Sequence, residues 1–169
     1  MAPQARYQPL NSLGLALARE MNETDFQNDL VIPMAEYGGW KVMHISDSRK
    51  QVGGELVGDA GTAGYPDLHL VHPRYGEIHA ELKRQVGWKW RKGQRDWLDA
   101  FAEVAAVQAD WATSAAAHLG DAVVDLLGPM PRVYAALWRP EDLPIIEHVL
   151  VHHRLDLGVW WPDNDPGGT

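Results

Sequence analysis

Apolar side chains recur at helical spacing near the start of the chain. Asn22-Glu-Thr-Asp supplies helix-capping residues, and the apolar positions from Phe26 to Met34 then follow three or four residues apart, up to Gly38-Gly39. This pattern predicts an amphipathic helix over about 23–37, after a short helix within 10–19.

The next part of the chain has the alternation that is typical of strands. Segments 41–46, 67–72 and 77–83 are predicted strands, and Pro73-Arg-Tyr-Gly between the last two has the composition of a turn. Residues 53–64 hold five glycines and few large apolar side chains. That composition predicts a mobile loop.

The second half of the chain returns to helical spacing. A helix is expected from about Lys92, with Trp97, Leu98 and Phe101 on one side, and an Ala-rich stretch over 110–128 predicts another. A strand over 132–138 and a helix over 141–150 follow, and Pro162–Thr169 is expected to be disordered. This order predicts an α/β fold with a small mixed sheet flanked by helices.

Length and composition narrow the class of protein. The chain has 169 residues, 46% of them hydrophobic, and no cysteine, which predicts one globular domain without disulfides or thiolate metal sites. The N-terminal region lacks a basic segment followed by an apolar run, and no stretch approaches 18 apolar residues. We therefore expect a cytoplasmic protein without a membrane span.

The charge is distributed unevenly. The net charge of −8 divides into +6 on the segment from Lys83 to Arg95, which contains no acid, and −14 on the rest. A concentrated basic segment on an acidic protein directs anionic ligands to one place.

The sequence GYPDLHLVHPRYGEIHAELKR, residues 64–84, suggests a metal site. Glu81 and Lys83 share one face of their strand, and Asp67 at the start of the neighbouring strand can approach the same edge. Two carboxylates there would suit a hard divalent cation, and a lysine beside them can orient a water or hold a phosphate. The alternative is the solvated, charged face of an ordinary hairpin.

Pro66-Asp67 followed by Glu81-Leu82-Lys83 resembles the motif of the PD-(D/E)XK nucleases, and more narrowly of their VRR-NUC branch. The likeness extends over most of residues 22–150. It includes Glu23-Thr-Asp-Phe-Gln27, Tyr37-Gly-Gly-Trp40, Gly64-Tyr-Pro-Asp-Leu, Gly93-Gln94-Arg-Asp-Trp97-Leu98 and the segment from Val133 to Leu150 with Trp138-Arg139-Pro140.

The resemblance implies a restriction-endonuclease-like core that hydrolyses DNA phosphodiesters with Mg²⁺ or Mn²⁺. Asp67 and Glu81 would be the main metal ligands, joined by Glu23 and the backbone carbonyl of Leu82. Lys83 would be the catalytic lysine, and Gln94 would reach the site from its helix. Gln94 has a second interpretation as a solvated helix position, and Glu23 as an acid favoured by the helix dipole.

The implied domain organisation has three parts: an N-terminal extension over 1–21, the nuclease domain over 22–150 and a C-terminal tail over 151–169. The sequence departs from the family between Asp99 and Pro131, where we expect an extra helical insertion at about 108–130. Its apolar face would pack on its own core or on a second subunit.

Three further groups have alternative interpretations. His44, His69, His72 and His79 match no compact metal motif, so surface or supporting roles are expected, and His152-His153 is interpreted as a solvated helix end. Trp88 and Trp90 alternate with basic residues and suit either stacking on unpaired bases or packing in the core. The glycine-rich segment lacks the Gly-Lys-Ser/Thr of a phosphate-binding loop, so a flexible cover over DNA is preferred.

The expected function is that of a metal-dependent DNA endonuclease selective for branched or flapped DNA, as in phage and bacterial Holliday-junction resolvases, acting as a homodimer. The basic segment would contact DNA through Arg84, Lys89, Arg91, Lys92 and Arg95. The alternatives are a repair or replication nuclease acting on flaps, ends or single strands, and a non-catalytic nucleic-acid-binding module.

Overall fold

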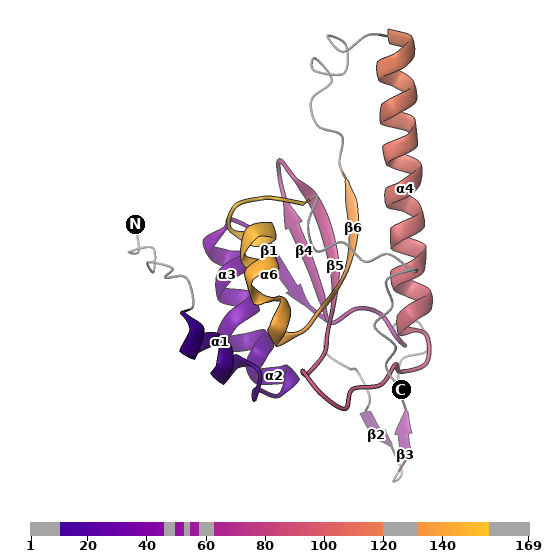
Figure 1. Cartoon of the computed structure of the whole chain (residues 1–169). Coiled ribbons are helices and arrows are strands. Elements are labelled where there is room, and N and C mark those ends of the chain that lie inside the picture. Colours follow the sequence, from indigo (N-terminus) through magenta and orange to yellow (C-terminus); the bar gives the residue numbers. More distant parts are fainter. Residues whose placement is uncertain (1–10, 46–49, 53–54, 58–62, 120–131, 156–169) are drawn as a thin grey trace.

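A four-stranded mixed sheet forms the centre of the computed structural model, which describes residues 11–45, 50–52, 55–57, 63–119 and 132–155 (Figure 1). The strand order is β1-β4-β5-β6. β1 (Lys41–His44), β4 (Leu68–His72) and β5 (Gly76–Leu82) are antiparallel neighbours, and β6 (Val133–Trp138) runs parallel to β5. The predicted α/β fold with a small mixed sheet is confirmed.

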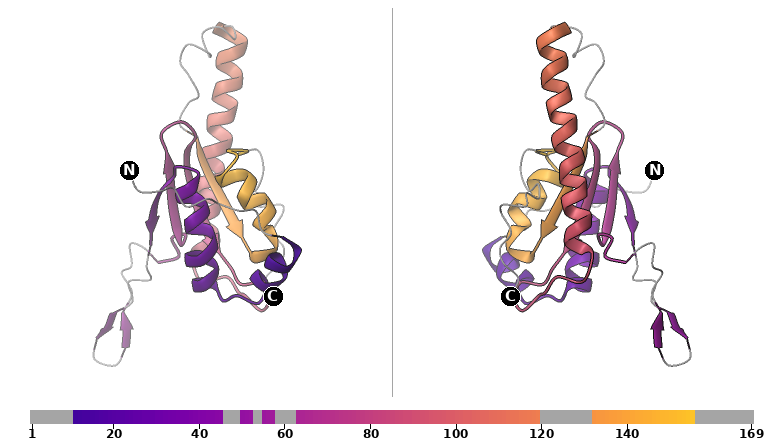
Figure 2. Two further views of the ribbon diagram at one scale, coloured as in Figure 1. Left: turned by 90° about the vertical axis from the view of Figure 1, so that its left-hand side faces the viewer. Right: turned by 90° about the vertical axis from the view of Figure 1, so that its right-hand side faces the viewer.

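The two faces of the sheet are covered by different helices (Figures 1 and 2). Ile78, Ala80 and Leu82 of β5 join the main hydrophobic core, which includes side chains of the helices before and after the sheet. Glu77, His79 and Glu81 alternate with them and therefore face α4 (Gln94–Leu119) on the other side. The chemistry-bearing residues of β5 thus lie under one helix.

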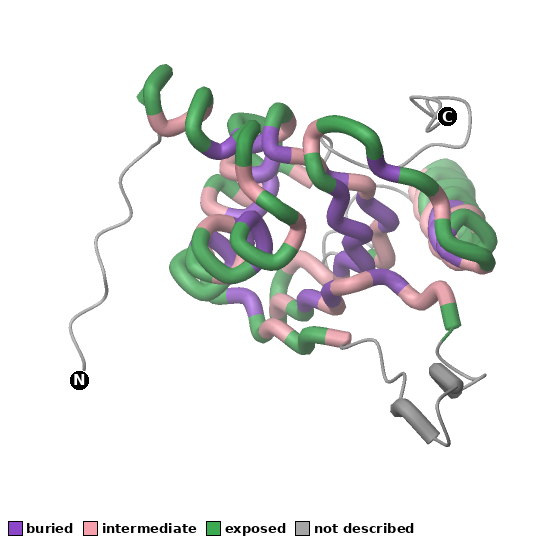
Figure 3. Tube along the Cα trace, turned by 90° about the horizontal axis from the view of Figure 1, so that it is seen from below, coloured by how far each residue is buried: buried purple, intermediate pink, exposed green. Residues whose placement is uncertain are grey.

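Buried residues are concentrated in the strands and on the inner sides of the helices (Figure 3). A smaller cluster, made of Leu98, Ala102 and Ala135, joins α4 to β6. It fixes the first half of α4 on the sheet, next to β5.

The helix predicted over 23–37 is present, with a change of register inside it. α2 (Glu23–Asp25) is followed by a π-helical segment, η1 (Phe26–Val31), and by α3 (Ile32–Tyr37). The π-helical segment ends two residues before Pro33, which has no N–H to donate and whose ring crowds the carbonyl four residues earlier. The Asn22 side chain accepts a hydrogen bond from Asp25 N–H (2.9 Å) and so caps the start, as its sequence position predicts.

The insertion expected at about 108–130 is helical as far as the structure describes it, but it does not form a separate helix. Residues 108–119 continue α4, which runs for 26 residues from Gln94 to Leu119. No glycine or proline interrupts this stretch, and alanine-rich sequence favours helix, so the helix that begins at the site extends beyond the sheet. Residues 120–130 of the predicted insertion lie outside the described residues.

The mobile loop predicted over 53–64 is also corrected in part. β2 (Lys50–Val52) and β3 (Glu55–Val57) form a two-stranded antiparallel sheet, with Gln51 opposite Leu56. The prediction of a loop gave weight to the glycines and overlooked Leu56-Val57, a pair of residues that favours a strand. Residues 58–62, also in the predicted loop, lie outside the described residues.

The ends of the predicted domain organisation pack on the core. α1 (Ser12–Ala18) buries Ala18 there, and after β6 the turn η2 (Pro140–Asp142) leads into α6 (Leu143–Leu150). Of the predicted tail, Val151 and Leu155 pack against the same core, whereas 156–169 lies outside the described residues. In the described part of the chain, no helix is long and apolar enough to cross a membrane.

Candidate functional site

Asp67 is fixed at the edge of the sheet by both of its neighbouring strands. Its backbone carbonyl accepts a hydrogen bond from Ile45 N–H (2.9 Å), just beyond β1. Its side-chain Oδ2 accepts a second one from Leu82 N–H (2.8 Å), at the end of β5. The carboxylate therefore lies beside the strand that carries Glu81, as the sequence predicts.

Glu81 and Lys83 form a buried hydrogen-bonded pair, which is an ion pair whenever Glu81 is ionised. Lys83 Nζ donates to Glu81 Oε1, and the exposed fractions of the two residues are 0% and 2%. Burial of a charged pair is costly unless further hydrogen bonds satisfy it. The alternative interpretation of this triplet as a solvated hairpin face is therefore wrong, because its glutamate and lysine are both in the interior.

Gln94 supplies those further hydrogen bonds. Its Nε2 donates to Glu81 Oε1, while its Oε1 accepts from Lys83 Nζ (3.1 Å) and from Arg91 N–H (2.8 Å). The residue is 3% exposed, so its alternative interpretation as a solvated helix position is excluded. Gln94 joins the first turn of α4 to both charged groups of β5.

A close backbone approach holds the start of α4 in this place. Gly64 has φ of +80°, and a Cβ atom on it would lie 2.5 Å from Gly93 C and 2.7 Å from Gln94 N. Only glycine tolerates both this conformation and this contact. Gly64 thereby brings the segment that leads to Asp67 against the helix start that carries Gln94.

One oxygen atom of Glu81 has no hydrogen bond in the described part of the chain. Its Oε2 is buried and has no partner within the described residues, which is rare for a buried carboxylate oxygen. Burial first, and the Asp67 carboxylate second, raise the pKa of Glu81 to about 8, against the opposing effect of Lys83. A cation that Glu81 and Asp67 share would satisfy this oxygen and remove the repulsion between the two carboxylates.

Glu23 and Arg91 lie at the margin of the same site. Glu23 Oε1 accepts from Arg84 N–H (3.4 Å), and Arg91 Nη2 lies 3.8 Å from Glu23 Oε2. Burial raises the pKa of Asp67, and the negative charge of Glu23 raises it further, while Lys83 and Arg91 lower it. Glu23 is thus close enough to Asp67 to act on it electrostatically, so its predicted place near the site agrees with the structure.

Comparisons with family models, with curated protein sequences and with solved structures return no match. The functional argument for this chain therefore depends on the chemistry of its own residues.

The basic segment divides into one buried and five exposed cations. Lys83 belongs to the site, whereas the others are exposed: Arg84, Lys89, Arg91, Lys92 and Arg95. Arg95 Nε lies 3.6 Å from Asp99 Oδ2 on the same helix. The segment joins the end of β5 to the start of α4, so its exposed cations border the site on one side.

Arg91 has a role in the site that sequence reasoning missed. Arg91 was predicted only as a DNA contact, but its N–H also holds Gln94, and its charge acts on both carboxylates.

Trp88 and Trp90 belong to the packing of the protein. Trp88 is 8% exposed, Trp90 packs against the cluster under α4, and their rings meet edge to face at 5.3 Å. Of the two alternatives that the sequence left open, the structure favours core packing over stacking on bases.

The histidines do not behave as one group. His69 and His79 come together with Glu77 on the α4 side of the sheet. His44 is exposed at the end of β1, and His72 lies in another aromatic cluster with Trp40 and Tyr75. His79 is 3% exposed, which excludes a surface role for it, and a supporting role stays a prediction.

The prediction that His153 belongs to a solvated helix end is wrong. Its positive φ of 56° turns it back from the helix end, so that its ring stacks on Tyr75 at 4.1 Å and its Nε2 lies 3.0 Å from Gly38 O. It packs against the protein instead of being solvated. His152 is exposed, as predicted.

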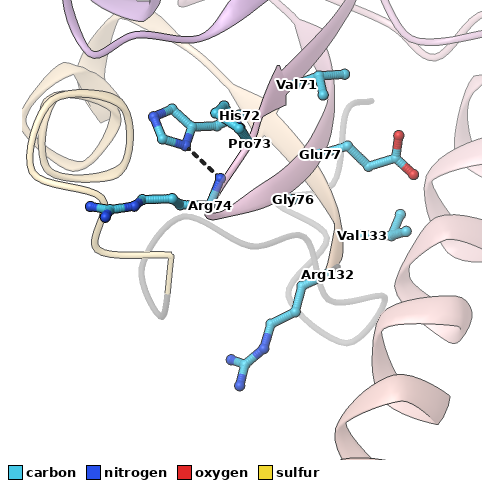
Figure 4. Close-up of a pocket in the computed structure, with 8 residues that line it drawn as sticks. All are labelled: Val71, His72, Pro73, Arg74, Gly76, Glu77, Arg132 and Val133. Carbon is cyan, nitrogen blue, oxygen red and sulfur yellow. Dashed lines mark hydrogen bonds between the residues drawn. The ribbon is translucent and has the colours of Figure 1, made fainter. Parts of the chain in front are cut away.

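A separate pocket of about 290 Å³ lies at the turn between β4 and β5 (Figure 4). Arg74, Arg132 and Glu77 contribute its charged groups, and His72 Nδ1 accepts from Arg74 N–H (3.1 Å). The turn is about 17 Å along β5 from Glu81, at roughly 3.4 Å per residue. This pocket is therefore distinct from the carboxylate site.

Proposed function

We propose that this protein is a divalent-metal-dependent DNA endonuclease with a restriction-endonuclease-like core. The observation that carries the proposal is the buried Glu81 carboxylate, whose Oε2 lacks a hydrogen bond among the described residues, beside Asp67 and Lys83. A binding surface for nucleic acid has no need of a buried, incompletely satisfied carboxylate next to a second one. A hydrolytic metal site does.

Asp67 and Glu81 fit a hard divalent cation such as Mg²⁺ or Mn²⁺, which prefers a few carboxylates and keeps several waters. Glu23, near Asp67, and the Leu82 carbonyl are the further ligands in the proposal. When bound, such an ion stabilises charge on a phosphate oxygen and makes a coordinated water more acidic.

The other residues position the reacting groups. Lys83 Nζ is held by Glu81 and Gln94, so its charge stays at a fixed place beside the carboxylates. There it can orient the attacking water or bind a phosphate oxygen. Gln94 fixes Lys83 and Glu81 together, and Arg91 N–H fixes Gln94 in turn.

DNA is the proposed substrate because the exposed cations next to the site fit a phosphate backbone. These cations follow β5 directly and end at α4, so a strand that enters the site passes along them. In the proposal the enzyme selects branched or flapped DNA, in the manner of a junction resolvase.

The test is cleavage of labelled linear, flapped, single-stranded and four-way DNA in Mg²⁺, Mn²⁺ or EDTA. The proposal expects internal cuts that require the metal, with the four-way or flapped DNA cut fastest. If linear duplex is cut as fast as four-way or flapped DNA, the proposed selectivity for DNA structure is contradicted, but the proposed nuclease activity is not. Tight binding of DNA without cleavage in either metal would instead support a non-catalytic module.

A further inference from the structure

A second group of potential metal ligands lies on the same side of the sheet as Glu81. His69 Nε2 is 2.8 Å from Glu77 Oε2, and His79 Nε2 is 3.9 Å from Glu77 Oε1. One ligand atom of each residue lies within 4.8 Å of the other two. Each imidazole therefore faces one oxygen of the same carboxylate.

The register of the sheet produces this grouping. His69 of β4 is directly opposite His79 of β5, and Glu77 is two residues from His79 on the same face. The pairing fixes both imidazoles next to one carboxylate before any ligand is bound.

A hydrogen bond from outside the group fixes His79. The Tyr65 hydroxyl lies 2.9 Å from His79 Nδ1, and the ring of Phe101 on α4 stacks on His79 at 3.6 Å. Metal-binding histidines typically use their second ring nitrogen in this way, because it sets the tautomer and the direction of the ligating nitrogen.

We propose that His69, Glu77 and His79 form a second metal site, which binds Zn²⁺ or a chemically similar transition-metal ion. Two imidazole nitrogens and a carboxylate are the donor set that such ions favour, whereas Mg²⁺ prefers oxygen ligands alone. The side chains of His69 and Glu77 are 19% and 37% exposed, so an ion can enter and a water can complete its coordination.

Binding requires one adjustment. The rings of His69 and His79 are stacked at 4.4 Å with an angle of 13° between their planes, so each Nε2 lone pair lies in its own, nearly parallel plane. His79 is held by Tyr65 and Phe101, whereas His69 is partly exposed. The ring of His69 therefore tilts toward Glu77 when an ion binds.

The ion would connect three elements of the fold. His69 comes from β4, the other two ligands come from β5, and Phe101 joins His79 to α4. Glu81 is only two residues beyond His79 on β5, about 7 Å away along the strand. The second site thus supports the strand that carries the catalytic carboxylate, and it does not depend on the proposed nuclease activity.

Zn²⁺ binding to the full chain, measured by isothermal titration calorimetry, tests this proposal in the Asp67→Asn/Glu81→Gln background. That background removes the carboxylate site, so one equivalent of Zn²⁺ should still bind. At a free Zn²⁺ concentration about a hundredfold above Kd, the unfolding midpoint should rise by roughly 5 °C or more.

In the same background, His69→Gln and Glu77→Gln should each weaken Zn²⁺ binding at least tenfold, while His118→Gln at the far end of α4 should not. Both test positions are partly exposed, and circular dichroism verifies that each variant is folded. Unchanged Zn²⁺ affinity in both variants, or no Zn²⁺ binding once Asp67 and Glu81 are replaced, would overturn the proposal.

Discussion

Gln94 is the residue on which the geometry of the candidate site depends most. Its amide contacts a carboxylate, an ammonium group and a backbone N–H, each with an atom of suitable polarity. Truncation of this side chain leaves a buried ion pair with fewer hydrogen bonds and lets Lys83 move.

We predict that Gln94→Ala lowers the DNA cleavage rate by about 10- to 100-fold, because it misplaces Lys83 and Glu81 without removing either. DNA affinity in EDTA should change little. Gln108→Ala, on the same helix but bonded to Val133 N–H, is the matched control and should cleave normally. Single-turnover cleavage rates of the two variants decide the matter, and equal rates would show that Gln94 has only a packing role.

The raised pKa of Glu81 predicts a pH dependence of stability in EDTA. The folded protein keeps a proton on Glu81 up to about pH 8, whereas the unfolded chain releases it near pH 4.5. Folded protein therefore binds the extra proton in this window, and the free energy of unfolding falls as pH rises. Glu81→Gln should abolish this part of the slope.

Thermal unfolding of wild type and Glu81→Gln between about pH 5 and 8.5 measures this effect, because that range includes the window between the two pKa values of Glu81. The comparison of the two proteins cancels the contribution of His79. Burial and the neighbouring His69 lower the pKa of that histidine to about 4. Mn²⁺ should raise the wild-type midpoint most at the alkaline end, because a cation displaces the proton. Parallel pH profiles in EDTA would contradict the raised pKa of Glu81.

The connection between β5 and α4 is the element that would contact DNA. We predict that replacing Lys89 and Lys92 with alanine lowers the slope of log affinity against log salt by about 1.8, at roughly 0.9 per lost phosphate contact with duplex DNA. Arg91 stays unchanged in this test because it also touches the site. Binding should weaken on all sequences alike.

The matched control replaces Lys41 and Arg74, two exposed cations outside this segment. Fluorescence anisotropy in EDTA at several salt concentrations gives both slopes. If replacing the control pair lowers the slope as much as replacing the test pair, DNA binding depends only on the total charge of the protein. The connection between β5 and α4 would then not be the DNA contact.

Sequence patterns predicted the helices and strands better than they predicted the contacts between these elements. The spacing after Asn22 indicated the helical run, and the Pro73–Gly76 turn indicated the hairpin that sets the register of β4 and β5. That register could also have placed His69 opposite His79. The π-helical segment before Pro33 needed the structure, because periodicity does not distinguish it from regular helix.

The candidate site was predictable in composition but not in geometry. Pro66-Asp67 and Glu81-Leu82-Lys83 indicated the residues, yet their spacing says nothing about burial. The complete burial of Glu81 and Lys83 follows from the position of α4 over β5. The hydrogen bond from Leu82 N–H to Asp67 likewise depends on how two strands end together.

At the scale of the whole molecule, α4 extends beyond the sheet (Figure 1). The helix also carries exposed apolar residues. Val104, Val107 and Trp111 are 44%, 61% and 50% exposed and lie on one side of the helix. The predicted homodimer remains a proposal, and this face is where we expect the subunits to meet. A two-fold dimer would present two sites to a DNA junction.

We predict that Val107→Glu with Trp111→Glu shifts the protein from dimer to monomer at micromolar concentration, because charges at an apolar contact are costly. Ala106→Glu, exposed on the other side of α4, is the control. Light scattering gives the masses. A wild-type protein that is already monomeric and still cuts four-way DNA would contradict the dimer.

The most direct test of the central claim is cleavage of labelled four-way and flapped DNA by purified Asp67→Asn and Glu81→Gln proteins in Mg²⁺ and in Mn²⁺. Both changes keep the side-chain size and remove a metal-binding charge. We predict that each lowers cleavage by on the order of a thousandfold, equivalent to about 4 kcal/mol, while DNA affinity in EDTA stays within a few-fold of wild type. Wild-type cleavage by either folded variant in Mg²⁺ would contradict the metal site.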